Sequence, residues 1–412
     1  MTTLLKPAGE NYISTYDTKP YYLACQIIAT GRGAKLYDYQ VQRQYSHKLF
    51  YREYLRLKQN YHQREDRSGF LVMPFVSNYY YYPPTTVPLL ALLGGFSQYQ
   101  LYIFTILATH AILLVLLGMV LCTKRSKLED LLLVLALILF SLPFTSNLYQ
   151  GQISWLVSSG AFFYFFFARR KQNFWAGLSL GILCFKPQLG LPFLIVPLLK
   201  RDYQSLVYCF LSTIFLVLLS LNWIGLEGMR DYYFSILSLF GEDPVGYVYL
   251  PPEHPVRSLP YLVSTFLRLS NQSGFCSLSE KHLLDIIQIF WLSIGISALG
   301  FLYISKRKDL FTLLLASLIA FMLPTYHTLA DYGFVVIILF VAIFFIPKLA
   351  KNLSLTYGLL FGLFPQIFLL IASFELTRPE KGDIALWLST LIVCIWLCWS
   401  WLKKKLNYLL PN

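Results

Sequence analysis

The sequence predicts an all-α, multi-pass integral membrane protein. Hydrophobic residues make up 56% of the 412 residues and charged residues only 13%, whereas a soluble domain carries about 25% charged residues. Long apolar runs alternate with short loops rich in Lys and Arg. A bilayer core of roughly 30 Å needs about 20 apolar residues per helix, which is the length that many of these runs reach.

The apolar runs predict the positions of the membrane helices in order along the chain. We expect about 9–11 such helices, together with short helices on the outer face and one broken helix hairpin. The predicted spans are 98–122, 129–146, 152–168, 204–223, 283–304, 309–324, 333–347, 353–372 and 384–402.

The basic residues predict the orientation of these helices. The net charge of +13 could suit a nucleic-acid partner, but about half of the 34 Lys and Arg residues lie in small clusters between apolar runs. Basic loops stay in the cytoplasm, so the charge reflects topology, the C-terminus is expected to be cytoplasmic, and no nucleic acid is expected to bind. The clusters are Lys124/Arg125/Lys127, Arg169/Arg170/Lys171, Lys200/Arg201, Lys306/Arg307/Lys308, Lys348/Lys351 and Lys403/Lys404/Lys405.

The segment 173–199 is an exception to simple alternation, since it begins after one basic cluster and ends at another. A single crossing would place Lys200 and Arg201 outside. We therefore expect a broken helix hairpin, in which two short helices meet at Lys186-Pro187. Proline lacks the backbone donor that would continue a helix, which suits a re-entrant turn.

The topology divides the chain into three expected parts. These are an extracytoplasmic N-terminal region, 1–97; a membrane core, 98–347, with the hairpin 173–199 and an outer loop 224–282; and C-terminal membrane helices, 348–412. Within the first part, 41–66 has an apolar face and basic residues elsewhere, which predicts a helix at the membrane surface or packed on the outer region. That face is formed by Val41, Tyr45, Leu49, Leu57 and Tyr61.

The seven cysteines and the acidic residues do not form a metal-binding pattern. Most of the cysteines lie in apolar runs, where they are typical small core residues. Cys25 and Cys276 would share the outer side, so a disulfide between them is an open alternative. No metal is expected, because the sequence has no compact Asp/His cluster.

Five short motifs follow one another along residues 13–347. In chain order they are STYDTKPYYLACQIIATGRGAKLYDYQ, YYPPTTVPLL, NLYQGQISWLV, RRKQNFWAGLSLGILCFKPQLGLPFLIVPLLKRDY and MLPTYHTLADYGFVVIILF. The series resembles glycosyltransferase family 87. The first motif is similar to the opening of the family's outer loop, the second to its aromatic-Pro-Pro segment, the third to its Gly-Gln helix start, the fourth to its Lys-Pro hairpin and the fifth to its Pro-aromatic-His loop.

The resemblance implies a GT-C-like fold and a glycosyltransferase that uses a polyprenyl-phosphate sugar as its donor. It would transfer mannose, or a similar hexose or pentose, from a polyprenyl-phosphate donor to a lipid-linked or cell-envelope glycan, with inversion and no cofactor. The active site would face the extracytoplasmic side of the plasma (inner) membrane, and membrane lipids would surround it. The family has a membrane helix before its catalytic loop, so we expect an in-frame apolar segment to be encoded upstream of Met1.

Such a transfer needs a carboxylate to remove the acceptor proton. By resemblance this base is Asp17, in the STYD motif. Its alternative role is an N-cap for a helix over 18–29, which Asp favours. Asp38 is the rival carboxylate and is predicted to be a structural turn residue, and Asp331 is a third candidate.

The phosphate needs cationic groups and hydrogen-bond donors. Lys186 is expected to contact it, because a charge at membrane depth costs at least ~2.5–3.5 kcal/mol and marks a functional site; its alternative is a snorkelling or salt-bridged lysine. His327 is expected at the same level, or is merely exposed. Gln150 and Gln152 flank a helix start and could bind the substrate or cap the helix. Tyr82 is a further expected contact, although Tyr79 to Tyr82 also suit membrane anchoring.

Two other functions remain as alternatives. A secondary transporter or lipid flippase also has broken helices and buried cations, but usually as a pair in two related halves. A surface-polysaccharide polymerase or ligase would use similar lipid-linked substrates, and several arginines in a dominant late outer loop would favour it. The stretch 224–282 has only Arg230, Arg257 and Arg268.

Overall fold

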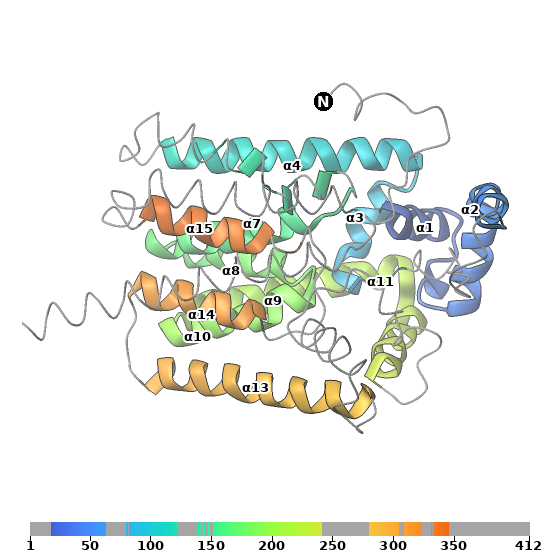
Figure 1. Ribbon diagram of the computed structural model, residues 1–412. Helices are drawn as coiled ribbons and strands as arrows, with labels where there is room; N and C mark the ends of the chain where they lie inside the picture. The colour runs from blue at the N-terminus through green and yellow to red at the C-terminus, as the bar shows by residue number, and fades with distance from the viewer. Residues whose placement is uncertain are drawn as a thin grey trace, which may run out of the picture. The chain divides into compact units, whose positions relative to one another are not determined.

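The computed structural model is mostly helical in the part of the chain that it describes (Figure 1). Its regular elements there are α-helices and short 3-10 helices, and no strand occurs among these residues. The prediction of an all-α chain is confirmed for them. The described residues are 18–62, 80, 82–121, 135, 138–139, 141, 143–144, 147–148, 151–240, 280–304, 309–322, 331 and 333–345.

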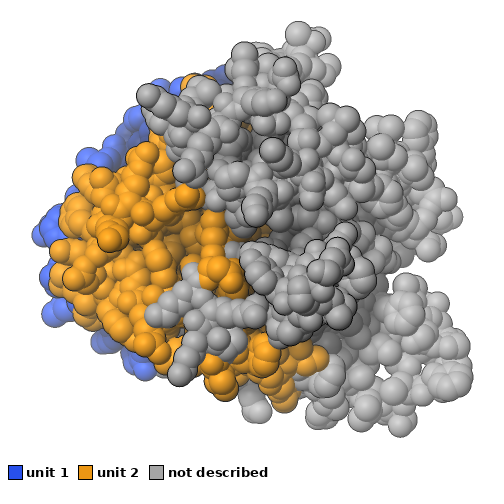
Figure 2. Space-filling view, turned by 90° about the vertical axis from the view of Figure 1, so that its left-hand side faces the viewer, with its two compact units in different colours: residues 1–109, 148–153, 213–252 blue, residues 110–147, 154–212, 253–412 orange. Residues whose placement is uncertain are grey.

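The chain forms two compact units whose segments alternate along the sequence (Figure 2). Unit 1 comprises residues 1–109, 148–153 and 213–252, and unit 2 comprises 110–147, 154–212 and 253–412. The predicted division at 97 and 347 stays a prediction, since the third predicted part lies outside the described residues.

Unit 1 packs helices of different lengths around a core of aromatic and aliphatic side chains. Its elements are α1 (Thr18–Ala29), η1 (Gly33–Lys35), α2 (Tyr39–His62), η3 (Pro84–Thr86), α3 (Val87–Leu92), the start of α4 (Gln98–Leu121) and the later part of α11 (Tyr203–Phe240). The predicted helix at 41–66 is therefore present as α2. Val41, Tyr45 and Leu49 of its apolar face pack against the unit 1 core, whereas its placement at a membrane surface stays a prediction.

Unit 2 contains the remaining helices, of which α7 and α8 make the most extensive contact. Its helices are the later part of α4, α7 (Ser154–Arg169), α8 (Asn173–Leu183), α9 (Pro187–Phe193), α10 (Ile195–Lys200), the start of α11, α13 (Glu280–Ile304), α14 (Leu310–Met322) and α15 (Gly333–Phe345). The helix α15 also packs on α7, and α14 packs on α9, α10, α13 and α15. In Figure 1 the axes of the helices α13, α14 and α15 are nearly aligned.

Glycines allow the close contacts of α8 with its neighbours. A Cβ on Gly160 of α7 would lie 2.6 Å from the backbone oxygen of Ser179 in α8. On α8, a Cβ on Gly177 would lie 2.7 Å from the Ser205 backbone oxygen of α11, and one on Gly181 would lie 2.8 Å from the Ser212 hydroxyl. Gly177 and Gly181 are four residues apart, which is the small-residue spacing that lets membrane helices approach closely.

The predicted break at Lys186-Pro187 is confirmed, because α8 ends at Leu183 and α9 begins at Pro187. The chain turns tightly there, since a Cβ on Gly190 would lie 2.6 Å from the Cα of Cys184. The second half differs from the expectation of one short helix, as it comprises α9 and α10. Pro197 has no N–H to donate to the Phe193 carbonyl, so the helix is interrupted between them.

Among the described residues, two helices are long and apolar enough to cross a membrane, at Gln98–Met119 and Tyr203–Ser235. In their most apolar stretches only 33% and 17% of the residues are buried. The described chain also has shorter apolar helices at Asn173–Leu183, Pro187–Lys200, Leu292–Ile304 and Thr312–Phe321. The predicted spans 353–372 and 384–402 lie outside the described residues.

The outer loop predicted from 224 begins differently, because α11 continues to Phe240. Its path breaks at Gly225, whose φ of 59° and ψ of −174° are not helical. Glycine has no Cβ and adopts this positive φ readily. The predicted end of the span near 223 thus coincides with the break, while the helix itself extends further.

Candidate active site

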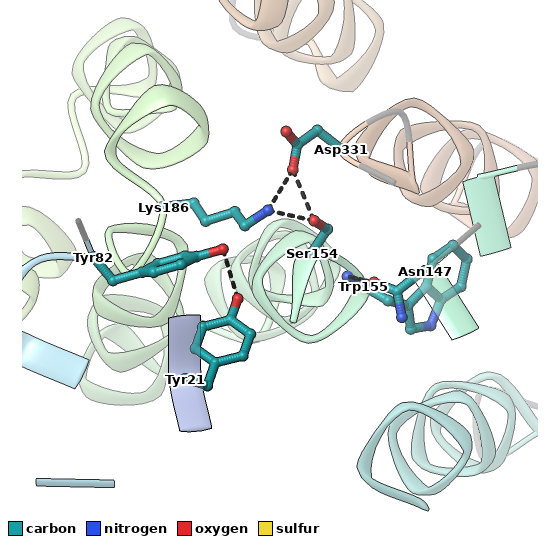
Figure 3. Close-up of polar contacts among 7 residues, drawn as sticks. All are labelled: Tyr21, Tyr82, Asn147, Ser154, Trp155, Lys186 and Asp331. Carbon is teal, nitrogen blue, oxygen red and sulfur yellow. Dashed lines mark hydrogen bonds and ion pairs between the residues drawn. The ribbon is translucent and has the colours of Figure 1, made fainter. Parts of the chain in front are cut away.

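A buried ion pair joins the broken hairpin to the start of α15. Lys186 Nζ donates to Asp331 Oδ1 at 2.8 Å and to Ser154 Oγ at 2.5 Å. The Ser154 hydroxyl in turn donates to Asp331 Oδ1 at 2.8 Å. The three side chains therefore form a closed triangle of hydrogen bonds, which we call the Lys186 triad (Figure 3).

Each member of the triad lies where a helix begins. Ser154 is the first residue of α7, and Asp331 precedes α15 by two residues. Lys186 is the N-cap of α9, with extended backbone angles of −117° and 96°. Its carbonyl accepts from the amides of Leu189 and Gly190 at 2.8 and 2.9 Å, so the backbone that starts α9 also fixes the root of the lysine side chain.

Water hardly reaches the triad. The side chains of Lys186 and Asp331 are only 2% and 0% exposed, and Ser154 is fully buried. Burial of an unpaired ion costs several kcal/mol, and this cost is offset only when the charges are paired and hydrogen-bonded. The triad satisfies this condition with charge-assisted bonds, which are about twice as strong as neutral ones.

Packed aromatic rings fix the helices that supply the triad. The ring of Phe334 lies 5.7 Å from that of Phe193 and stacks on Phe321 at 5.2 Å, measured between centroids. A Cβ on Gly333 would lie 2.9 Å from the Trp155 ring. The residues that make these contacts are close to Ser154 and Asp331 in the sequence. Their packing therefore fixes the backbone from which both side chains extend.

The start of α7 is held by one further polar contact. The Trp155 amide donates to Asn147 Oδ1 at 3.1 Å, which satisfies one of the backbone donors that a helix start leaves unpaired. Asn147 belongs to the third motif, NLYQGQISWLV. This asparagine caps the helix, a role that was not predicted from the sequence.

Tyrosines form a second polar cluster, which lies in unit 1. Tyr82 accepts a hydrogen bond from Tyr21 at 2.6 Å between hydroxyls, and its carbonyl accepts from the Tyr37 hydroxyl at 2.9 Å. Burial raises the pKa of Tyr37 well above its usual value, so its hydroxyl keeps the proton that it donates. Gln42 holds the neighbouring Tyr80 through both the amide and the carbonyl of that residue. Tyr82 is thus fixed at its backbone and at its hydroxyl.

The other predicted site residues lie in unit 1 or outside the described residues. Gln152 is 2% exposed and is part of unit 1. Asp38 caps α2, because its Oδ1 accepts from the amides of Gln40 and Val41 at 2.8 and 3.1 Å, which confirms its structural role. Asp17, Gln150 and His327 lie outside the described residues.

Comparison with known families identifies the chain. The model of glycosyltransferase family 87 matches residues 80–330, which is more than half of the sequence. The chain belongs to glycosyltransferase family 87. No curated protein and no solved structure gave a match.

The family 87 match covers most of the predicted contacts. Tyr82, Gln150, Gln152, Lys186 and His327 lie within it, whereas Asp17 precedes it and Asp331 directly follows its last residue. Ser154 was not predicted to be a partner of Lys186, although it lies in the third motif and near the start of the predicted span 152–168. Asp331 was a third candidate base, and the structure shows it paired with Lys186.

Proposed function

We propose that this family 87 glycosyltransferase transfers a sugar from a polyprenyl-phosphate donor to a lipid-linked or cell-envelope glycan. The transfer takes place at the extracytoplasmic face of the plasma (inner) membrane. The donated sugar is mannose or a similar hexose or pentose. The observation that carries the proposal is the match to the family over residues 80–330, together with a buried cation in the broken hairpin.

Exposed apolar helices support the location in the membrane. The helix α11 is one of the two long apolar helices among the described residues, and its Phe210, Phe215 and Leu218 are 66%, 63% and 58% exposed. The core helix of a soluble protein would bury such side chains, whereas a membrane helix exposes them to lipid. A lipid-linked donor would then reach the enzyme within the same bilayer.

We assign the chemistry to residues of the chain as follows. Asp17 removes the proton of the acceptor hydroxyl as that oxygen attacks the anomeric carbon. The bond from that carbon to the phosphate oxygen breaks, so the configuration inverts and polyprenyl phosphate leaves with the bond electrons. Lys186 and His327 stabilise the negative charge that develops on the phosphate.

Tyr82, Gln150 and Gln152 are proposed substrate contacts. Tyrosine hydroxyls and amide side chains both donate and accept hydrogen bonds, which suits sugar hydroxyls. We also propose that the reaction uses neither a metal nor another cofactor, because lysine and histidine can neutralise a monophosphate leaving group. Among the described residues no group of three His, Cys, Asp or Glu side chains could hold a metal ion.

A panel of donors tests this function. Membranes that contain the chain are incubated with labelled polyprenyl-phosphate mannose, glucose and arabinose, and with the corresponding nucleotide sugars. We expect transfer from at least one lipid donor, release of polyprenyl phosphate in equal amount, and loss of transfer in Lys186→Met. Transfer from nucleotide sugars alone would contradict the proposed donor. Movement of the intact lipid sugar across the membrane without transfer would instead support a transporter or flippase.

A further inference from the structure

We propose that Asp331 and Ser154 are positioning residues, which hold the Lys186 ammonium where it binds the donor phosphate, and that the ion pair persists when the donor is bound. This inference rests on the proposed function, because it takes a lipid phosphate as the group that Lys186 recognises. Neither residue is assigned a contact with the substrate.

The hydrogen bonds of the triad fix the position of the Lys186 side chain. A lysine side chain has four flexible carbons, and ordering it costs about 2 kcal/mol of rotamer entropy. Asp331 and Ser154 come from segments 145 and 32 residues away in the sequence, and both bind Nζ within 2.8 Å. The ammonium is therefore fixed before any substrate binds, and this lowers the entropic cost of binding.

Few charged side chains lie on the helices next to the triad. The helices α8, α9, α14 and α15 contain no charged side chain within their bounds. In α7 the titratable residues are Tyr164 and Arg169, which are ten and fifteen residues beyond Ser154; the Tyr164 hydroxyl faces Asp202 instead. Among these helices and Asp331, the carboxylate of Asp331 therefore supplies the negative charge next to the Lys186 ammonium.

A lysine can hold a carboxylate and a phosphate at the same time. In protein kinases a lysine contacts the nucleotide phosphates while a glutamate from a neighbouring helix holds it in an ion pair, and catalysis requires that pair. The Lys186 triad has the same division of roles, with Asp331 in the place of the glutamate and a buried hydroxyl as an additional partner. This is a comparison of roles and not of fold.

Binding of undecaprenyl phosphate tests the inference on the purified full chain in detergent. Undecaprenol, which lacks the phosphate, is the second probe and reports the contribution of the lipid. We expect Asp331→Asn to weaken undecaprenyl phosphate binding roughly tenfold or more, because it removes one member of a buried charge pair. Binding of undecaprenol should not change, and Asp331→Glu should restore part of the affinity for the phosphate.

A matched pair of serine variants separates positioning from folding. Ser154→Ala removes a hydroxyl that binds Lys186, whereas Ser158→Ala removes a buried hydroxyl one turn further along α7. Ser158 Oγ has no hydrogen-bond partner among the described residues. We expect Ser154→Ala to weaken undecaprenyl phosphate binding severalfold and Ser158→Ala to leave it unchanged. If Asp331→Asn does not fold, the two serine variants still test whether the triad positions Lys186.

The outcomes separate this inference from the proposed function. If the unaltered chain binds undecaprenyl phosphate no better than undecaprenol, the proposed donor class is wrong and the inference fails with it. If the unaltered chain prefers the phosphate but folded Asp331→Asn and Ser154→Ala bind it as tightly, only the inference fails. Tighter binding by Asp331→Asn would mean that the carboxylate competes with the phosphate, which also contradicts the inference.

Discussion

Lys186 Nζ and Asp331 Oδ1 lie 2.8 Å apart in a buried ion pair, although 145 residues separate them in the sequence. The pair joins the break of the hairpin to the segment before α15, and Ser154 bonds to both side chains.

Removal of one charge from the triad should destabilise the protein. Lys186→Met leaves the Asp331 carboxylate buried without its cation, at a cost of about 3–5 kcal/mol. The triple variant Ser154→Ala/Lys186→Met/Asp331→Leu removes all three members of the triad together, and apolar replacement of a whole buried ion pair is often neutral or stabilising. Unfolding temperatures in detergent should therefore fall in the single variant and recover in the triple one. Equal losses in both would contradict the account of the pair.

The close contact of α7 with α8 should not tolerate an added methyl group. Gly160→Ala places a Cβ 2.6 Å from the Ser179 backbone oxygen, and overpacking of this kind typically costs about 1–3 kcal/mol. Gly118→Ala in α4 is the matched control, because a Cβ there meets nothing within 4 Å and alanine favours a helix. The unfolding temperature should fall in Gly160→Ala only. An unchanged value in Gly160→Ala would mean that α8 can shift away from α7 without loss.

Tyr82 should have a role that Tyr21 does not share. The two hydroxyls form one hydrogen bond, so Tyr21→Phe and Tyr82→Phe both remove it and should cost similar stability, about 0.5–1.5 kcal/mol. If Tyr82 contacts the substrate, only Tyr82→Phe should also raise KM in steady-state transfer assays. An identical KM in both variants would leave Tyr82 as an anchor of unit 1.

The proposed base predicts a large loss of turnover. Asp17→Asn should lower kcat by about 10²–10⁴, because asparagine cannot accept the acceptor proton. Binding of undecaprenyl phosphate should remain, since the base acts on the acceptor. Asp38→Asn is the control, because asparagine caps helices as well as aspartate does and Asp38 caps α2. Full turnover by Asp17→Asn would move the base role to another carboxylate.

The helices could be predicted from the sequence because they depend on local signals. The helix expected at 18–29 is α1 (Thr18–Ala29), and the span expected at 98–122 is α4 (Gln98–Leu121). The break at Lys186-Pro187 follows from the missing amide of proline. The division of 187–199 into α9 and α10 was missed, although Pro192 and Pro197 were visible in the sequence.

The pairing of the site residues could not be predicted in this way. Lys186 was recognised as unusual from its apolar surroundings, and a salt bridge was one of its two interpretations. Its partner could not be identified, because the contact with Asp331 depends on how α7, α9 and α15 pack. Periodicity and composition describe single segments, so they contain no information about such contacts between distant segments.

Transfer by the triple variant Ser154→Ala/Lys186→Met/Asp331→Leu tests the central claim most directly. The claim is that a lysine held by Asp331 serves a polyprenyl-phosphate-dependent glycosyltransferase. With the lipid donor that the unaltered chain uses, we expect the triple variant to be folded, to melt near the temperature of the unaltered chain, and to lose transfer. A stable triple variant that transfers the sugar at the rate of the unaltered chain would show that the triad only supports the fold, and would contradict the claim.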